Sequence, residues 1–411
     1  MLRVLGKNIV IYGGTNAIKS LVPFIMLPIL TFHISTKEYG DLALIETTIL
    51  FLLPFIMLNI NGAINVEYFK INSQEEFKKY VLNAIFLSFL AFIAVTLILF
   101  LFEDKLETLI HLDKKWIELL SFFTFLRVLT SVVLVIFQAS QRALNFAYFS
   151  IAQTILDFLV SYYLVVILGY GISGRLIGVY GAYFIFSLIA IYILYKMDYF
   201  KVDFSLKFTK EILAFGISLI PHSIGGVVLA MSDRYFISYF VGNSEVGIYS
   251  VGYQIAAVLL LVSMSVNQAW TPIFFKMMKN RDFYKIKKLK ILLFVIYSLS
   301  SIFVYFISDF LYDIFIDKKF HNSKEYFLYL LIGFLFQSYY FLFTNYLFYY
   351  KRTKLLALIT ISGAVFNIIL NYILINIYGA IGVAYATAIT WFLYFVSVLI
   401  IATKIDREER A

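Results

Sequence analysis

Long apolar runs alternate with short polar or charged breaks along the whole chain. As a helix rising ~1.5 Å per residue, a run of about 20 residues spans the ~30 Å hydrocarbon core of a bilayer. The pattern therefore predicts an all-α integral membrane protein. It has twelve expected transmembrane helices, at residues 8–32, 41–67, 81–102, 116–138, 146–168, 175–195, 211–240, 246–268, 290–312, 326–349, 355–377 and 380–403.

Prolines interrupt two of these runs. Pro23 and Pro28 lie in the first run, and Pro221 lies in the long seventh run. Because proline lacks the backbone N–H and its ring clashes with the preceding turn, we expect a break in the first helix and a bend in the seventh.

Composition supports the membrane assignment and narrows the chemistry. The chain is 62% hydrophobic and 14% charged, whereas soluble domains are about 25% charged. It has no cysteine, so disulfides and thiolate metal sites are excluded. Its four histidines show no metal-ligand spacing, and His222, beside Pro221, is expected to be a packed residue. No metal or cofactor is expected.

The lysines and arginines predict the orientation. With the N-terminus in the cytoplasm, the inside segments hold 23 of them and the outside segments hold 8. Basic residues concentrate on the cytoplasmic side of membrane proteins, so we expect both termini to be cytoplasmic. The net charge of +9 follows from this bias. The basic loop 276–290 is expected to face anionic lipid rather than nucleic acid.

The two halves of the chain resemble each other. Glu38-Tyr39-Gly40 precedes the second predicted helix, and Glu245-Val246-Gly247 precedes the eighth at an offset of 207. Asp157 matches Asn367 at an offset of 210. The offsets predict two six-helix lobes, at residues 1–205 and 206–411. Such repeats can rock about a central cavity and give alternating access.

Lys19 is the cation that most needs an explanation. It lies twelve residues after Lys7, which is ~18 Å into the first helix and near the bilayer midplane. A lysine at this depth costs on the order of 2.5–3.5 kcal/mol. The functional interpretation is that Lys19 faces a hydrated cavity and meets an anionic ligand. The alternative is that Asn59 and buried water satisfy it, and Asn61 lies at a similar depth.

Charged residues of other helices suggest further roles. Arg127 and Asp157 lie at matching depth on the fourth and fifth predicted helices, so we expect them to form a structural ion pair. Glu46 lies closer to the outer surface than Lys19 does. Asp233 and Arg234 are adjacent, so each is expected to pair with a neighbouring helix. They are candidates for a gate or for interfacial anchors.

Uncharged polar residues complete the candidate set. Asn367 and Asn371 are four residues apart and therefore share one face of the eleventh predicted helix. Gln254 lies at mid-depth on the eighth. Such faces either line a substrate path or hold helices together by hydrogen bonds.

Several stretches together resemble a known family. They are Tyr39-Gly40, Ser232-Asp233-Arg234-Tyr235, Asn267-Gln268-Ala269-Trp270-Thr271-Pro272, and the run Gly363 to Asn371 followed by Gly379 and Gly382. With the twelve-helix plan, they resemble the polysaccharide transporters of the multidrug/oligosaccharidyl-lipid/polysaccharide exporter superfamily, the Wzx-type O-antigen flippases. This resemblance covers essentially the whole chain.

The resemblance implies a function and a location. Family members move a polyprenyl-diphosphate-linked oligosaccharide from the cytoplasmic to the periplasmic leaflet of the bacterial inner membrane, for lipopolysaccharide O-antigen synthesis. Their cavity is cationic, which implies substrate contacts for Lys19, Asn59, Asn61, Gln254, Asn367 and Asn371. Coupling to protons or sodium would involve Glu46, Asp157 or Asp233. The implied partners are membrane lipid, a polysaccharide polymerase and a chain-length regulator.

Two other functions remain open. A multidrug cation antiporter of the same superfamily would favour an acidic cavity, whereas the first helix here supplies Lys19. A membrane enzyme, such as an O-antigen polymerase or an acyltransferase, is the alternative from another class. The absence of a large outer loop and of a catalytic histidine cluster argues against it.

Overall fold

A computed structural model describes residues 2–200 and 203–408. Within these residues the fold is all-helical, and twelve helices are long and apolar enough to cross a membrane. The predicted fold class is therefore confirmed. The principal helices are α1 (Leu2–His33), α2 (Thr36–Met57), α3 (Ile60–Lys70), α4 (Gln74–Leu101), α5 (Glu103–Ile110), α6 (Lys114–Ala139), α7 (Ala143–Tyr162), α8 (Gly171–Lys196), α9 (Leu206–Met231), α10 (Asp233–Phe240), α11 (Asn243–Ala256), α12 (Val258–Lys279), α13 (Phe283–Phe315), α14 (Lys324–Tyr349), α15 (Thr353–Tyr378) and α16 (Ile381–Glu408).

The helix interruptions differ from those that the prolines predicted. α1 runs unbroken through Pro23 and Pro28, so the expected break there is wrong. Helices inside a membrane tolerate proline when neighbouring groups satisfy the freed carbonyls. The second predicted span is instead divided between α2 and α3, where Leu58 and Asn59 both take left-handed backbone angles, with φ of 50° and 52°.

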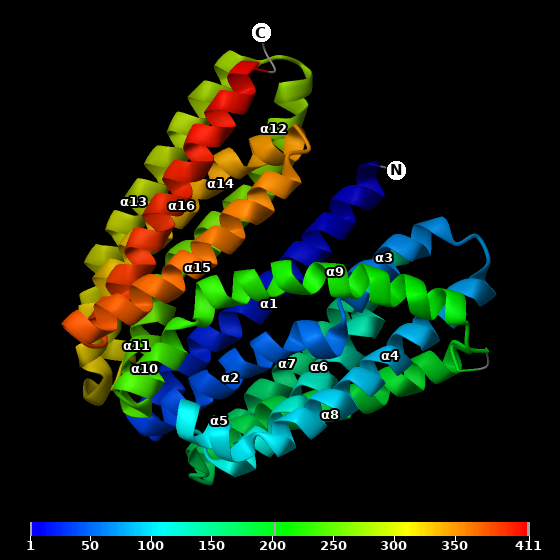
Figure 1. Ribbon diagram of the computed structural model, residues 1–411, viewed down its shortest axis with the longest axis horizontal. Coiled ribbons are helices and arrows are strands. Elements are labelled where there is room, and N and C mark those ends of the chain that lie inside the picture. The colour runs from blue at the N-terminus through cyan, green and yellow to red at the C-terminus, as the bar shows by residue number, and fades with distance from the viewer. Residues whose placement is uncertain (1, 201–202, 409–411) are drawn as a thin grey trace. The chain divides into compact units, whose positions relative to one another are not determined.

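The chain forms two compact units, Met1–Ile224 and Gly225–Ala411. The division falls inside α9, whereas the sequence placed it between residues 205 and 206. The part of α9 up to Ile224 belongs to the first unit. In that unit α2, α6 and α8 pack together, and α7 packs against α8 (Figure 1).

Close backbone contact fixes α9 in the first unit. A β-carbon placed on Gly216 would lie 2.3 Å from the Leu58 carbonyl oxygen, so only glycine allows this approach. The Asn59 amide donates to the Gly216 carbonyl at 3.2 Å and accepts from the Ser223 hydroxyl at 3.1 Å. The junction between α2 and α3 is thereby joined to α9 at two points.

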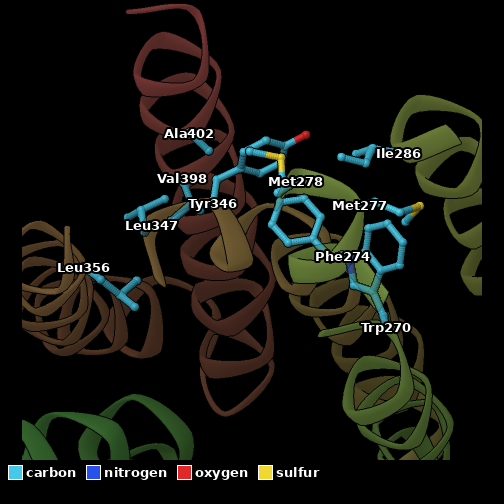
Figure 2. Close-up of a cluster of buried hydrophobic side chains, with 10 residues drawn as sticks. All are labelled: Trp270, Phe274, Met277, Met278, Ile286, Tyr346, Leu347, Leu356, Val398 and Ala402. Atoms are coloured by element: carbon cyan, nitrogen blue, oxygen red, sulfur yellow. The ribbon is translucent and has the colours of Figure 1, made fainter. Parts of the chain in front are cut away.

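The second unit has an aromatic core between the ends of its long helices (Figure 2). α14 packs against α16 and α12, and α15 packs against α16. Phe274 on α12 meets Tyr346 on α14 edge to face, with ring centroids 4.7 Å apart. Val398 and Ala402 of α16 are fully buried against this cluster. Edge-to-face rings add to the burial of apolar area in holding the helices together.

Candidate functional site

Lys19 lies on α1, eight residues after the start of the span Ile11–His33. Its side chain is half-buried. It forms no hydrogen bond or ion pair with any other residue that the structure describes. No carboxylate and no amide group of these residues bonds to the Lys19 ammonium, so water or an anionic ligand must compensate its charge.

The two asparagines considered as partners of Lys19 lie elsewhere. Asn59 bonds to Gly216 and Ser223 of α9. Asn61 accepts a 3.2 Å hydrogen bond from Ser131 on α6. The alternative in which Asn59 satisfies Lys19 is therefore wrong in this structure.

Arg127 pairs with Glu46, not with Asp157. The Arg127 guanidinium lies 2.5 Å from the Glu46 carboxylate, and Tyr180 on α8 donates to the same carboxylate at 2.7 Å. The predicted Arg127–Asp157 pair is wrong because α2 begins earlier than expected, at Thr36. Glu46 then lies ten residues into its helix and Arg127 thirteen residues into α6, at similar depth.

Asp157 pairs with Arg175, which is the first residue of the sixth predicted helix. Arg175 lies four residues into α8 and reaches the Asp157 carboxylate at 2.5 Å. The Ser161 hydroxyl also donates to this carboxylate, at 3.0 Å, one helical turn further along α7. Glu46 and Asp157 are thus both neutralised by arginine.

Asp233, at the start of α10, is a buried carboxylate with hydroxyl and amide partners. Its side chain is 1% exposed. It accepts hydrogen bonds from Tyr249 of α11 at 2.5 Å, from Thr387 of α16 at 2.7 Å and from Asn371 of α15 at 2.9 Å. No lysine or arginine within the described residues forms an ion pair with it. Of the three coupling candidates it alone lacks a direct cationic partner.

Asn367 and Asn371 extend this cluster. Both side chains are buried, and the Asn371 amide donates to the Asn367 oxygen at 3.0 Å. Ser232 donates to that oxygen as well, at 3.1 Å, and Asn367 donates to Thr390 of α16 at 3.3 Å. The Asn371 oxygen is buried without a hydrogen-bond partner. This arrangement favours the hydrogen-bonding role over a place on a substrate wall.

Arg234 follows Asp233 and lies beside two tyrosine rings of α11. Its guanidinium lies over the Tyr253 ring of α11, 4.5 Å from the centroid, and near the Met231 sulfur. The guanidinium also lies 6.0 Å from the centroid of the Tyr249 ring, whose hydroxyl donates to Asp233, so the two adjacent charges share this neighbour. Gln254, also on α11, is half-buried.

His222 is exposed on α9, so the expectation of a packed histidine is wrong. Tyr180, Arg175, Tyr249 and Thr387 were not among the predicted site residues, although each binds one of the candidate carboxylates. The only signal in the sequence was a polar side chain within an apolar span, which many structural residues share.

Solved structures show which class of fold this is. The lipid II flippase MurJ, in an inward closed conformation, matches with a TM-score of 0.78 at 18% identity, covering 96% of this chain and 87% of that chain. An inward-facing multidrug resistance transporter of the MATE family matches with a TM-score of 0.78 at 13% identity, covering 95% of this chain and 96% of that chain. The chain has the fold of the multidrug/oligosaccharidyl-lipid/polysaccharide exporter superfamily.

Sequence comparison gives the family. The profile of the polysaccharide biosynthesis protein family matches residues 5–278, and the chain belongs to this family. The MatE profile matches residues 222–373. A protein of the Lsg locus of Haemophilus influenzae is 24% identical over 361 residues, covering 85% of this chain and 86% of the relative. An uncharacterized membrane protein of the same organism is 24% identical over 402 residues, covering 92% and 94%.

These findings confirm the family resemblance that the motifs suggested. They describe a multi-pass membrane protein of the polysaccharide biosynthesis protein family, with the fold that MurJ and the MATE transporters share.

Proposed function

We propose that the protein is a flippase for a polyprenyl-diphosphate-linked oligosaccharide repeat unit. It would move this unit from the cytoplasmic to the periplasmic leaflet of a bacterial inner membrane by alternating access. The match to the polysaccharide biosynthesis protein family supports a glycan as part of the substrate. The observation that carries the proposal is Lys19, whose charge no described residue neutralises within a membrane span.

The chemistry of the substrate explains why a lysine belongs there. A diphosphate cannot enter hydrocarbon unaided, because removing its charges from water costs far more than thermal energy. A fixed ammonium beside a hydrated path lowers this barrier through charge-assisted hydrogen bonds to phosphate oxygens. The Lys19 ammonium would have no anionic partner between transport cycles and would pair with the diphosphate during its passage. No covalent chemistry and no cofactor are needed.

The coupling ion would act at Asp233. The Asp233 carboxylate lies beside the hydroxyl oxygens of Tyr249 and Thr387. Such a group of oxygens with one negative charge suits a single small hard cation. The unpartnered oxygen of Asn371 supplies a further donor atom. Within the described residues no group of three or more acidic or histidine side chains forms a metal site, which argues against a divalent ion. Proton and sodium coupling both fit, because a buried carboxylate can take up either.

The decisive experiment is transport by the purified full-length protein in proteoliposomes. Fluorescent undecaprenyl-diphosphate glycans would be added to one leaflet, and their movement would be measured by quenching from outside. Imposed sodium and proton gradients would identify the coupling ion. Movement no faster than in protein-free vesicles, under either gradient and across several glycans, would refute the proposal.

A multidrug antiporter is the second candidate, because the MatE profile matches residues 222–373. Efflux of cationic dyes from the same vesicles would support it. An uncompensated lysine in the path would repel such cations, so we expect lipid-linked glycan to be preferred. The same proposal places both termini in the cytoplasm. It also gives the protein two neighbours in the membrane, a polysaccharide polymerase and a chain-length regulator. Labelling of the termini and cross-linking in cells would test them.

A further inference from the structure

A polar cavity of about 380 Å³ lies in the first unit, away from Lys19 and from the buried ion pairs. The end of α3, the first turns of α4 and the first turns of α9 form its walls. Its lining includes Glu67, Lys70, Tyr80, Glu211 and Phe215. None of these residues has a place in the proposed transport site.

The helix ends put this cavity at the level of lipid head groups. Lys70 is the last residue of α3. Tyr80 lies six residues into α4 and Glu211 five residues into α9, which is ~9 Å and ~8 Å from the ends of these helices. Polar head groups and the first carbons of the acyl chains occupy this depth of a bilayer. By the charge distribution, this is the cytoplasmic leaflet.

The walls are held in place by contacts outside the cavity. Asn83 of α4 is 1% exposed, and its oxygen accepts from the Thr209 hydroxyl at 3.0 Å and from the Ser205 backbone N–H at 3.3 Å. Tyr80 also meets Phe208 edge to face, at 5.4 Å between centroids. The start of α9 is therefore fixed against α4, and Glu211 is positioned on the wall.

Several polar groups that line the cavity have hydrogen-bonding capacity that the described residues do not use. Tyr80 is 2% exposed, yet its hydroxyl forms no hydrogen bond with the described residues. Glu67 accepts from Lys70 through Oε1 at 2.9 Å, so its other oxygen is available. Glu211 has no hydrogen-bond or ion-pair partner in the described part of the chain. The Tyr80 side chain lines the cavity, so its hydroxyl is accessible to a ligand there.

We propose that the cavity binds the head group of a phospholipid that carries a primary ammonium. The ammonium has three N–H donors, and the carboxylates of Glu67 and Glu211 and the hydroxyl of Tyr80 offer three acceptors. The adjacent phosphate would meet Lys70, whose side chain is 65% exposed. Phe215 provides an apolar wall for the glycerol and upper acyl carbons. An anionic head group without an amine would face two carboxylates and be repelled.

A methylation series tests this assignment. The full-length protein in detergent would be offered phosphatidylethanolamine, its N-methyl and N,N-dimethyl derivatives and phosphatidylcholine, all with the same acyl chains. Lipid retained by the protein would be measured by native mass spectrometry. Each methyl group replaces one N–H donor, so retention should fall stepwise, by about tenfold or more from the first lipid to the last.

Variants locate the binding. Glu211→Gln and Tyr80→Phe should each reduce the preference for phosphatidylethanolamine severalfold. Asp203→Asn makes the same charge change on an exposed residue at the same end of the first unit and should leave it unaltered. Thermal unfolding of each variant would identify a loss of folding. If Tyr80→Phe fails to fold, Glu211→Gln still decides, because Glu211 is exposed.

Equal retention across the methylation series would overturn the proposal, as would a preference that survives both Glu211→Gln and Tyr80→Phe. Soluble glycerophosphoethanolamine provides the last arm. Binding of this compound as tight as that of the lipid would place the ligand in the aqueous phase and refute a membrane lipid. The proposal does not depend on transport, so failure of the flippase assay leaves it standing.

Discussion

Arg127 on α6 and Glu46 on α2 form an ion pair at 2.5 Å, and Tyr180 on α8 bonds to both. The Tyr180 ring stacks on Phe123 with centroids 3.9 Å apart, so its hydroxyl has little freedom to turn away. One pair of opposite charges thereby joins three helices of the first unit. This role is structural, and it leaves neither charge available to a substrate.

Breaking this pair should destabilise the protein. Arg127→Met leaves the Glu46 carboxylate without its cation inside the membrane, and we expect a loss of about 2 kcal/mol or more in unfolding free energy. The Glu46 side chain is 35% exposed, so solvent offsets part of the cost. Thermal unfolding in detergent would measure the loss. The double variant with Glu46→Gln should recover stability, and equal losses in single and double variants would contradict the pairing.

Lys19→Gln should slow transport without reducing membrane abundance. The variant removes the fixed cation and keeps a polar, hydrogen-bonding side chain that is one bond shorter. Loss of one charge-assisted contact to phosphate corresponds to about a tenfold slower rate. Lys19→Arg should retain most of the activity, and Lys105→Gln, an exposed position beyond the fourth helix, serves as the control. Unchanged flipping in Lys19→Gln would remove Lys19 from the substrate path.

Asp233→Asn should abolish the response of transport to the ion gradient. The variant keeps the shape of the side chain but removes the negative charge that would attract the cation. Thr387→Val should weaken the response about tenfold through the loss of one oxygen donor, whereas Thr387→Ser should preserve it. Transport rates at varied sodium concentration and pH would be compared at equal protein in the vesicles. If Asp233→Asn responds like the unaltered protein, coupling occurs elsewhere.

Gly216→Ala should destabilise the first unit. The added β-carbon would lie 2.3 Å from the Leu58 carbonyl oxygen, and such overpacking costs about 1–3 kcal/mol. Gly14→Ala is the matched change, because no atom lies within 4 Å of the β-carbon there. In a helix that variant should be neutral or stabilising by up to about 1 kcal/mol. Similar melting temperatures for the two variants would show that α9 does not approach Leu58 this closely.

Alkaline pH should destabilise the connection between α8 and α9. Burial raises the pKa of Tyr199 to about 12. Between pH 10 and this value the unfolded chain releases the tyrosine proton while the folded chain keeps it, so stability falls as pH rises. Tyr199→Phe should flatten the decrease of melting temperature between pH 10 and 12. An unchanged slope would mean that the Tyr199 hydroxyl is solvated.

The sequence was sufficient for the fold because hydropathy and helix length are local properties. The number of apolar helices follows from the runs of apolar residues, but the eighth predicted helix, 246–268, is divided between α11 and the span Val258–Lys279. The depth of a residue in the membrane is harder to predict from the sequence, because it depends on the residue at which the helix begins. An error of five residues at the start of α2 placed Glu46 too near the surface and led to the wrong partner for Arg127.

Partners from distant segments could not be read from the chain. Asp233 contacts residues of α11, α15 and α16, and no periodicity reports which helices meet. The sixth predicted helix begins at Arg175, whereas α8 begins four residues earlier, at Gly171, so the sequence did not show that Arg175 lies inside the helix. Conversely, the matched positions Asp157 and Asn367 each bond to the polar residue four places later, Ser161 and Asn371. That correspondence agrees with the repeat.

The left-handed pair Leu58 and Asn59 affects how a mutational scan of this protein should be interpreted. A hydropathy plot presents the stretch from Thr36 to Lys70 as one peak, yet this stretch is two helices, α2 and α3, joined at Leu58 and Asn59. Substitutions in α2 will report on the contacts of this helix with α6 and α8, whereas substitutions at the junction of α2 and α3 will report on its contacts with α9. A scan that averages over the whole peak would merge two unrelated phenotypes.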